Sequence, residues 1–559
     1  GVQTCALPIS TVGAGGPVMI RIALAQKDFP VGDLRGNLDR ALNSLDEARD
    51  EGVQLLVFPE LALTGYPPED LLLRAGFLRQ AAGCLDKLVA AVSGIDVVIG
   101  HPWQEQGRLF NALSWIRSGR VIGRYLKHQL PNYAVFDEQR YFVAGNDSLV
   151  MALGDCRIGV LICEDSWVPG PVAQARAAGA ELLLIANASP YRDDQLDARA
   201  EMMAARFSES GIPMVYCNLV GGQDELVFDG RSMLYDHRGP ASMLGPLCAD
   251  SQLLVEFDAG SALLTPGTGW VSAKISKIGE IYRVLVRGLS DYVHKNGFGH
   301  VVLGLSGGVD SALTLALCVD ALGADRVHAV MMPSKFTSRL SLNMAREQAR
   351  ALGVDYHIIE INAGLETLER ELTMSLGGPP EGLTHENLQA RIRGQMIMAL
   401  SNQFGWLPIA TSNKSEMAVG YSTLYGDMCG GFAPLKDCLK TRVYQLAEYR
   451  NLTREVIPNA VIERPPSAEL RPEQTDQDSL PPYDELDAIL HRYVDRDRSV
   501  AEIVGDGFEE ATVRRVAAMV LNNEYKRRQA PPGVRVTSRG FGRDRRYPIT
   551  SGWRENPND

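Results

Sequence analysis

The chain has 559 residues, too many for one ordinary hydrophobic core, and its 45% apolar and 22% charged residues are globular values. A formal net charge of -12 argues against a general nucleic-acid or membrane binder, because both of those partners attract basic surfaces. No apolar run approaches the ~18 residues that span a bilayer, and the nine cysteines include no Cys-x-x-Cys pair, so we expect a cytoplasmic protein without a disulfide framework or a zinc knuckle.

The first half of the chain alternates between short apolar runs and amphipathic stretches. Residues 1–18 lack this pattern and have no positively charged leader, so we expect an unstructured extension there. The runs that predict strands are MIRIALAQ, VQLLVFPE, DVVIGHP, CRIGVLICED, ELLLIANAS and PMVYCNLVGG. The stretch NLDRALNSLDEARDEG has helical spacing and ends at Gly52. We predict an α/β domain over residues 19–262, then a linker at 263–275 that contains TPGTGW.

The second half begins a new series of elements. KIGEIYRVLVRGLSDYVHKNG predicts a helix, and the following strands are predicted by HVVLGLS, RVHAVMMPS, DYHIIEI and LPIATS. We predict a second α/β domain over residues 276–530. Residues 531–559 are basic and polar, so we expect a weakly ordered tail.

A glycine pair stands between a predicted strand and a helix in LSGGVDS, residues 305–311. The free N–H groups of a helix N-terminus attract an anion, Ser306 and Ser311 add hydroxyls, and Asp310 adds a carboxylate suited to Mg²⁺. The alternative is an ordinary two-glycine turn. The lysine of G-x-x-x-x-G-K-[ST] is absent, which indicates chemistry other than transfer of the terminal phosphate.

This stretch resembles the SGGxDS loop of the ATP pyrophosphatases, which cleave ATP between the α and β phosphates. The resemblance implies a loop that holds the departing pyrophosphate. It implies ATP contacts from Gly304, Leu305, Ser306, Gly307, Gly308, Val309, Asp310 and Ser311.

The segment ATSNKSEMAVGYSTLYGDMCGGFAPLKDCLKT, residues 410–441, follows a predicted strand and is rich in glycine, hydroxyl and charged residues. A long surface loop is the alternative, but its place after a strand's carboxyl end favours a site. With ENLQARIRG at 386–394 and PPSAEL at 465–470, it resembles the NAD synthetase family. The resemblance implies a doubly wound parallel sheet like that of adenine nucleotide alpha-hydrolases. It also implies ATP contacts from Thr411, Lys440 and Ser467, deamido-NAD contacts from Asn387, Arg391, Glu416 and Lys526, and Mg²⁺ on Asp310 and Glu416.

One position separates two branches of this family. Members that use free ammonia often carry a lysine where this chain has Leu424, whereas GYSTLYGDMCGGFAPLKD follows the glutamine-dependent branch. This branch implies a second active site that takes ammonia from glutamine.

Three residues at predicted strand ends in the first half are candidates for that site: Cys163 in RIGVLICEDSW, Glu60 in LLVFPELALTGYPPEDLL and Lys127 in YLKHQLPNYAVFDEQRYF. Taken singly, they could be a core cysteine, a helix cap and a surface charge. A nucleophilic thiol, however, needs a base and a positive neighbour. The three contexts together resemble the nitrilase, or carbon–nitrogen hydrolase, superfamily, which implies an αββα sandwich.

The superfamily implies a role for each residue. Cys163 attacks the glutamine side-chain amide, Glu60 transfers the proton, and Lys127 stabilises the oxyanion. Glu138 is expected to be a supporting carboxylate. The implied glutamine contacts are Tyr133, Ser189 and Gln195, the last at a position where a basic residue is expected.

The two predicted sites make chemical sense together, because free ammonia at neutral pH is mostly unreactive ammonium. The expected reaction adenylates the nicotinate carboxylate of deamido-NAD, releases pyrophosphate, and forms NAD and AMP by attack of ammonia delivered through the interior. Two alternatives stay open: an amidotransferase for a different acid, and a binding or sensing protein. Formation of AMP and pyrophosphate with each acid distinguishes them. We also expect a homo-oligomer.

Overall fold

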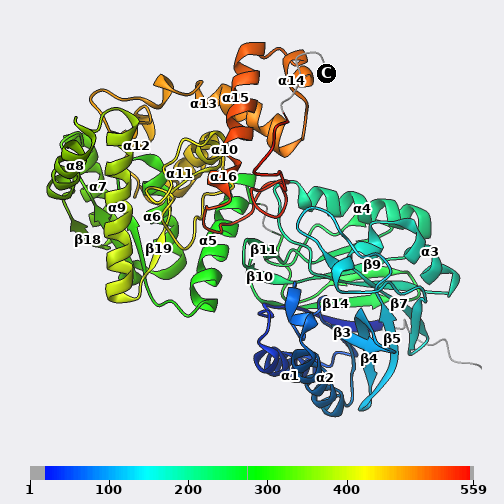
Figure 1. Ribbon diagram of the computed structural model, residues 1–559. Coiled ribbons are helices and arrows are strands. Elements are labelled where there is room, and N and C mark those ends of the chain that lie inside the picture. The colour runs from blue at the N-terminus through cyan, green and yellow to red at the C-terminus, as the bar shows by residue number, and fades with distance from the viewer. Residues whose placement is uncertain (1–18, 273–274, 554–559) are drawn as a thin grey trace, which may run out of the picture.

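The computed structural model describes residues 19–272 and 275–553. The predicted unstructured extension at 1–18 lies outside these residues. Two domains lie side by side, the first coloured blue to green and the second green to orange in Figure 1. No helix in the described part of the chain combines the length and the apolar character needed to cross a bilayer.

Two sheets form the centre of the N-terminal domain, packed face to face. The first sheet has the order β15-β14-β1-β2-β3-β4-β5, and the second has the order β13-β12-β9-β8-β7-β6. The strands of the first are β1 (Met19–Gln26), β2 (Leu55–Val57), β3 (Asp96–Glu105), β4 (Arg108–Arg117), β5 (Arg120–Leu126), β14 (Ser251–Asp258) and β15 (Leu263–Pro266). Those of the second are β6 (Leu149–Leu153), β7 (Cys156–Ile162), β8 (Leu182–Asn187), β9 (Met214–Asn218), β12 (Met233–Asp236) and β13 (Gly239–Pro240).

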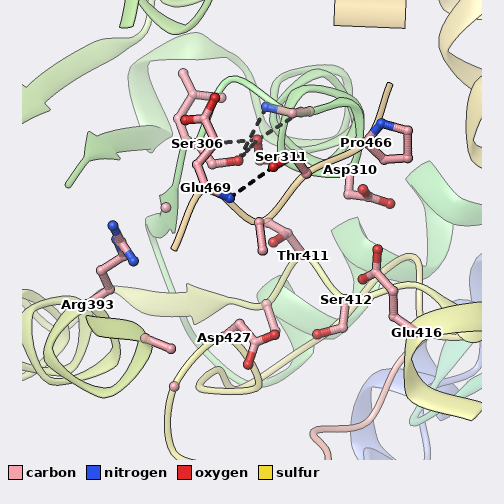
Figure 2. A pocket seen from close by; sticks show the side chains of 18 of the residues that line it. Ser306, Asp310, Ser311, Arg393, Thr411, Ser412, Glu416, Asp427, Pro466 and Glu469 are labelled. Atoms are coloured by element: carbon pink, nitrogen blue, oxygen red, sulfur yellow. Dashed lines mark hydrogen bonds between the residues drawn. The ribbon is translucent and has the colours of Figure 1, made fainter. Parts of the chain in front are cut away.

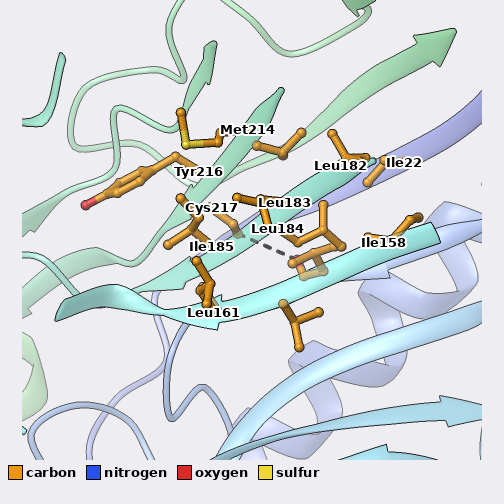
Figure 3. Close-up of a cluster of buried hydrophobic side chains, with 14 of the residues drawn as sticks. Ile22, Ile158, Leu161, Leu182, Leu183, Leu184, Ile185, Met214, Tyr216 and Cys217 are labelled. Carbon is orange, nitrogen blue, oxygen red and sulfur yellow. Dashed lines mark hydrogen bonds between the residues drawn. The ribbon is translucent and has the colours of Figure 1, made fainter. Parts of the chain in front are cut away.

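The apolar core of this domain lies between the two sheets. Figure 3 shows Ile22 of the first sheet in one cluster with Ile158, Leu182 and Leu184 of the second. All four side chains are almost fully buried. Burial of aliphatic side chains at about 25 cal/mol per Å² makes this inter-sheet layer the main source of the domain's stability.

Helices cover the outer face of each sheet. Helix α1 (Leu34–Asp50) and helix α2 (Ala75–Ala91) pack on the first sheet, and α3 (Pro169–Ala177) and α4 (Gln195–Ser210) pack on the second. In α1, Leu38, Ala41, Leu45 and Ala48 form one buried stripe at helical spacing. The layers are therefore αββα, which confirms the predicted sandwich.

The predicted linker at 263–275 is wrong in its first part. Leu263–Pro266 forms strand β15, which pairs antiparallel with β14 at the edge of the first sheet. Leu264 and Trp270 are buried, and the Trp270 indole N–H donates to the Leu254 carbonyl at 2.7 Å. A four-residue strand in a segment rich in glycine, proline and threonine lacks the alternation that would have revealed it.

The C-terminal domain contains a four-stranded parallel sheet with the order β18-β17-β16-β19. The strands are β16 (Val301–Gly304), β17 (Val327–Met331), β18 (Asp355–Ile358) and β19 (Leu407–Ile409). One face packs on α5 (Lys277–Lys295), α6 (Val309–Leu322), α7 (Arg339–Leu352) and α11 (Lys440–Asn451). The other face packs on α8 (Asn362–Leu376) and α9 (Leu383–Phe404). Helices on both faces of a parallel sheet confirm the predicted doubly wound fold.

A small helical cluster, which the sequence pattern did not predict, extends this domain. It contains α13 (Tyr483–Leu490), α14 (Val500–Gly505), α15 (Glu510–Asn522) and α16 (Glu524–Arg527), and it packs on the short helix α10 (Lys414–Val419). Another short helix, α12 (Asn459–Glu463), lies against the main sheet domain. These helices are mostly shorter than the windows in which helical periodicity becomes visible.

Residues 531–546, here called the C-terminal arm, lie between the two domains and appear red in Figure 1. Val534 and Val536 are buried, and the Arg535 N–H donates to the Glu225 carbonyl of the N-terminal domain at 2.8 Å. Arg543 pairs with Glu69 at 2.6 Å. The expectation of a weakly ordered tail is therefore wrong for the arm, because it buries apolar side chains and pairs basic residues such as Arg543 and Arg545 with carboxylates of the two domains.

Candidate active sites

A pocket of about 290 Å³ opens at the carboxyl ends of β16, β17 and β19. Its walls come from the loop between β16 and α6, from α9, and from segments within residues 410–429 and 461–476. Figure 2 shows their side chains converging on one space. The crevice at the carboxyl ends of parallel strands is where open α/β sheets bind ligands.

The loop at residues 304–308 is fixed by its own hydroxyl groups. Ser311 Oγ lies 3.0 Å from Ser306 Oγ and donates to the Gly308 carbonyl at 3.0 Å. Gly307 has φ of +81°, and a Cβ there would come within 2.6 Å of the Ser341 carbonyl oxygen. Helix α6 begins at Val309, so its free N–H groups face the pocket beside this loop. The arrangement suits a phosphate group.

One end of the pocket carries two carboxylates and a lysine. Lys440 Nζ donates to Asp310 Oδ2 at 2.5 Å and to Glu416 Oε1 at 3.0 Å, and Asn413 donates to the other oxygen of Asp310 at 2.8 Å. Burial raises the pKa of Glu416, although the nearby Lys440 ammonium opposes that shift. The two carboxylates therefore converge on a single cation.

This pair of carboxylates fits a magnesium ion. Among the residues that the structure describes, no three histidine, cysteine or acidic side chains group together as metal ligands. Mg²⁺ is usually held by one or two carboxylates, with water and substrate phosphate completing the octahedron. Asp310 and Glu416 are two carboxylates of this kind, and both line the pocket beside the loop at residues 304–308.

The structure brings most of the predicted nucleotide contacts into this pocket. The predicted residues that line it are Gly304, Leu305, Ser306, Gly308, Val309, Asp310, Ser311, Thr411, Glu416, Lys440 and Ser467. Gly307 is not among the lining residues and packs closely against the Ser341 backbone. Three predicted deamido-NAD contacts are not among the lining residues and instead lie around residues 420–424. Asn387 accepts a hydrogen bond from the Thr423 hydroxyl at 2.9 Å. Arg391 donates to the Leu424 carbonyl at 3.2 Å, and Lys526 donates to the Gly420 carbonyl at 2.7 Å.

Sequence reasoning did not single out several polar residues that line the pocket, among them Arg393, Asp427 and Glu469. Each lies inside a motif that carried the family resemblance, ENLQARIRG, GYSTLYGDM or PPSAEL. Burial raises the pKa of Asp427 to about 6. A motif locates such residues, but it does not say which of its side chains face a cavity.

The second site lies in the N-terminal domain, where Glu60, Lys127 and Cys163 are all buried. Each follows the carboxyl end of a strand, β2, β5 or β7. Cys163 has φ of +42°, a strained value for a residue with a side chain, at the turn from β7 into a short 3₁₀ helix. The structure therefore brings the three predicted residues into one cluster.

Lys127 is the electrostatic centre of this cluster. Its Nζ donates to Glu60 Oε1 at 2.6 Å and to Glu138 Oε1 at 2.7 Å, with 1% of its side chain exposed. Burial raises the pKa of the Cys163 thiol well above its usual value, Glu60 raises it further, and Lys127 lowers it. The resting thiol is therefore protonated and needs a base. Burial also raises the pKa of Glu138 against the effect of Lys127.

Two further side chains hold this cluster in place. Asn111 on β4 donates to Glu60 Oε1 at 2.7 Å. Asp165 accepts from the backbone N–H of His128 at 3.0 Å and of Gln129 at 2.7 Å, which ties the turn after Cys163 to the segment after Lys127. The sequence offered no signal for these roles beyond the identity of the residues, because each role depends on the packing of separate strands.

The predicted glutamine contacts lie in two groups. The Ser189 hydroxyl accepts from Gln195 Nε2 at 3.2 Å and from Arg199 Nε at 3.2 Å. Tyr133, by contrast, donates to Glu164 at 2.9 Å. Glu164 directly follows Cys163 in the chain, and Cys163 is among the groups that raise the pKa of Tyr133, after burial and Glu164. Sequence reasoning missed both Glu164 and Arg199.

Comparison with known proteins gives matches over almost the whole chain. Residues 281–530 match the NAD synthase family and residues 21–244 match the Carbon-nitrogen hydrolase family. The chain is 50% identical over 540 residues to the Glutamine-dependent NAD(+) synthetase of Xanthomonas campestris pv. campestris (strain 8004), covering 96% of this chain and 98% of that protein. It is 46% identical over 540 residues to that of Acinetobacter baylyi, covering 96% and 99%.

Solved structures agree with these matches. The structure of glutamine-dependent NAD+ synthetase from Acinetobacter baumannii in complex with adenosine diphosphate is 42% identical, with a TM-score of 0.78 and coverage of 96% of this chain and 100% of that chain. A glutamine-dependent NAD(+) synthetase from Cytophaga hutchinsonii is 22% identical and shares the fold, with a TM-score of 0.83 and coverage of 96% and 98%.

Proposed function

Because this chain belongs to the family of glutamine-dependent NAD(+) synthetases, we propose that it amidates deamido-NAD to NAD with ammonia from glutamine. ATP drives the reaction, and AMP, pyrophosphate and glutamate are released. The observation that carries this proposal is that one chain contains both the Glu60–Lys127–Cys163 cluster and a pocket lined by the 304–311 loop. Neither a sensor nor a simple amidase needs both.

In the N-terminal site, Cys163 attacks the side-chain amide carbon of glutamine. Glu60 lies near the protonated, buried thiol and takes its proton. Lys127 stabilises the negative charge that develops on the amide oxygen. Collapse of this intermediate breaks the C–N bond, Glu60 returns the proton to the leaving nitrogen, and ammonia departs. Water then hydrolyses the thioester to glutamate and restores the thiol.

The residues around this cluster have supporting roles. Glu138 shares the Lys127 ammonium with Glu60, so that one lysine pairs with two carboxylates. Two pairs of polar groups are available to hold the charged end of glutamine: Ser189 with Gln195, and Tyr133 with Glu164. We assign them this role.

In the C-terminal site, the loop with Ser306 and Ser311 binds the phosphates of ATP. The nicotinate carboxylate attacks the α-phosphorus, pyrophosphate leaves, and ammonia then attacks the adenylated carboxyl carbon and displaces AMP. Asp310 and Glu416 would hold a magnesium ion, which neutralises the charge that builds on the pyrophosphate. Lys440 adds a positive charge at the same end of the pocket. Thr411 and Ser467 complete the ATP contacts, and Asn387, Arg391 and Lys526 hold deamido-NAD.

We also propose that the enzyme self-associates. Met374, Leu376 and Leu383, near the junction of α8 and α9, are 68%, 67% and 71% exposed. Several large apolar side chains exposed together are uncommon on a monomer. Light scattering of the full chain measures the mass directly, and a monomer at micromolar concentration contradicts this part of the proposal.

The test of the function separates the two sites with Cys163→Ala. Without the thiol no thioester forms, so glutaminase activity and glutamine-dependent NAD synthesis should fall by about 10³-fold or more. High ammonium at mildly alkaline pH should restore NAD synthesis, because the second site is untouched. NAD, AMP and glutamate are measured in parallel.

The matched control is Cys84→Ala, the same substitution on α2 outside both sites, which should keep both activities. If Cys163→Ala retains glutamine-dependent synthesis, Cys163 is not the nucleophile. If ammonium fails to rescue a folded Cys163→Ala variant, the two sites are not separable in the way proposed.

A further inference from the structure

Helix α9 presents two different faces to its surroundings. Asn387 and Arg391 are four residues apart, so they lie on one face and contact the 423–424 segment. Arg393 is two residues further on, about 200° around the helix axis, and therefore lies on the opposite face. Arg393 and Ile397, four residues further on, line the nucleotide pocket from that face.

The Arg393 guanidinium has unused hydrogen-bonding capacity. Its Nε donates to the Met332 carbonyl at 2.9 Å. Within residues 19–272 and 275–553 no group accepts from its two terminal nitrogens. The carboxylate of Glu469 is already occupied, since one of its oxygens accepts from the hydroxyls of Ser338 at 2.8 Å and Ser341 at 2.7 Å. Arg393 lines the pocket, and the four N–H bonds of its terminal nitrogens have no acceptor among the residues that the structure describes.

The surroundings of Arg393 make these unused donors costly. Burial lowers the pKa of Arg393 to about 10, with the Glu469 carboxylate opposing, so the side chain remains charged at neutral pH. A charged donor taken partly out of water loses hydration that only an acceptor can replace. An acceptor supplied by a bound ligand would recover that free energy.

The position of Arg393 indicates which part of the ligand it meets. Figure 2 shows Arg393 across the pocket from Asp310 and Glu416, which form the end suited to phosphate and metal. The wall near Arg393 includes the apolar side chains of Val330, Met332 and Ile397. A nucleotide anchored by its phosphates at the carboxylate end would extend its nucleoside toward this wall.

We propose that Arg393 recognises the nucleoside half of ATP by donating hydrogen bonds to acceptor atoms of its ring nitrogens or ribose oxygens. The inference rests on the proposed function, in which this pocket binds ATP. Deamido-NAD is a different case, because its proposed contacts Asn387 and Arg391 lie on the other face of α9. Arg393 is thus a specificity-determining residue for one of the two nucleotide substrates.

The first experiment measures steady-state kinetics of Arg393→Lys and Arg393→Met with ammonium as the nitrogen donor. Loss of a charge-assisted hydrogen bond should raise the KM for ATP about 10- to 100-fold in Arg393→Met. The kcat should change by less than about threefold, and the KM for deamido-NAD should stay constant. Arg393→Lys keeps the charge and should be affected less. Arg370→Met, an exposed arginine on α8, is the control for loss of charge.

The second experiment identifies the acceptor. Wild type is compared with Arg393→Met on ATP, 2′-deoxy-ATP, 1-deaza-ATP, 3-deaza-ATP and 7-deaza-ATP. The analogue that lacks the acceptor should bind wild type less tightly than ATP, and Arg393→Met should no longer distinguish the two. Loss of discrimination against 2′-deoxy-ATP assigns the ribose, and loss against a deaza analogue assigns that ring nitrogen.

Two results would overturn the inference: an unchanged KM for ATP in both folded Arg393 variants, or a rise in the KM for deamido-NAD alone. Calorimetric titration of wild type and Arg393→Met with ATP and magnesium keeps this test separate from the proposed function. If wild type makes no NAD, the function fails. If wild type binds ATP and Arg393→Met binds it equally well, the inference fails even though the function stands.

Discussion

The carboxylate of Asp310 accepts a hydrogen bond from Lys440. In the proposed reaction the same carboxylate also binds the magnesium ion. An amide in its place carries no negative charge, so Asp310→Asn should bind the metal poorly and leave the pyrophosphate charge uncompensated. We expect NAD synthesis to fall at least about 100-fold with either nitrogen source, while the glutaminase half-reaction continues. The measurement is NAD and glutamate formation by the same preparation. Near-normal synthesis would remove Asp310 from the metal site.

His101 makes a separate prediction about acid stability. It is 1% exposed on β3, its Nδ1 lies 2.9 Å from the Pro102 carbonyl, and its Nε2 lies 2.7 Å from the Ser114 hydroxyl. These contacts suit a neutral ring with its proton on Nδ1. Burial lowers the pKa of His101 to about 4, from an ordinary value of 6.5.

The unfolded chain therefore binds one more proton than the folded chain between about pH 6.5 and pH 4, so stability rises with pH across this window. The contribution of His101 is complete above pH 6.5 and is lost, by up to about 3 kcal/mol, as pH falls toward 4. Urea unfolding of wild type and His101→Gln at several pH values checks this. Carboxylates titrate in both proteins, so the effect of His101 is the difference between their free energies of unfolding at each pH. If the free energy of unfolding changes equally with pH in the two proteins, the prediction is wrong.

At the residue scale, sequence patterns predicted groups with distinctive motifs and missed groups defined only by packing. Cys163, Asp310 and Glu416 stand in recognisable contexts. Asn111 has no such context, and Asp165 lies inside the Cys163 motif without a sign of its role. The partners of both follow other strands and are reached only once the sheets are assembled.

At the scale of elements, the loop before α6 depends on one backbone conformation. Gly307 has φ of +81° and no room for a Cβ beside the Ser341 carbonyl. Gly307→Ala should distort the loop and raise the Kd for ATP at least about 10-fold, measured by calorimetry. Gly364→Ala is the matched control, because Gly364 lies within α8 with ordinary space around it. That variant should bind ATP normally and gain up to about 1 kcal/mol of stability. Normal ATP binding by Gly307→Ala would show that the loop adapts.

The elements that could be predicted are those with long, regular patterns. The strands β16 and β17 are apolar except for His328, which is typical of strands buried on both faces. Helix α15 also has a helical pattern, with Val513, Val516, Ala517 and Val520 buried at i, i+3, i+4 and i+7, which the sequence analysis missed. By contrast, β15, the short helices α14 and α16 and the C-terminal arm have no such signal, since their buried side chains are few. Their stability comes from neighbours that are distant in sequence, as in the contact of Val534 with α5.

At the scale of the whole molecule, a buried ion pair joins the two domains. Arg231 of the N-terminal domain donates to Glu280 on α5 at 2.7 Å, and their side chains are 6% and 9% exposed. Glu280→Ala would leave a buried arginine unpaired, which costs about 3–5 kcal/mol. Replacing both partners, as Arg231→Met with Glu280→Leu, should recover most of this loss, because no unpaired charge remains.

Thermal and denaturant unfolding of the wild type, the single variant and the double variant provide the measurement. A single variant as stable as wild type would mean that water reaches Arg231. If the double variant is no more stable than the single one, Arg231 and Glu280 stabilise the protein by more than cancelling each other's charge.

The C-terminal arm also has a consequence for how the protein is made. Every residue of both domains leaves the ribosome before residues 531–546, and domains generally fold in that order as they emerge. The nascent chain therefore carries two domains that still lack Val534 and Val536 of the C-terminal core and the contact of Arg543 with Glu69. The two domains therefore complete their assembly late, when the C-terminal arm has been translated and packs between them.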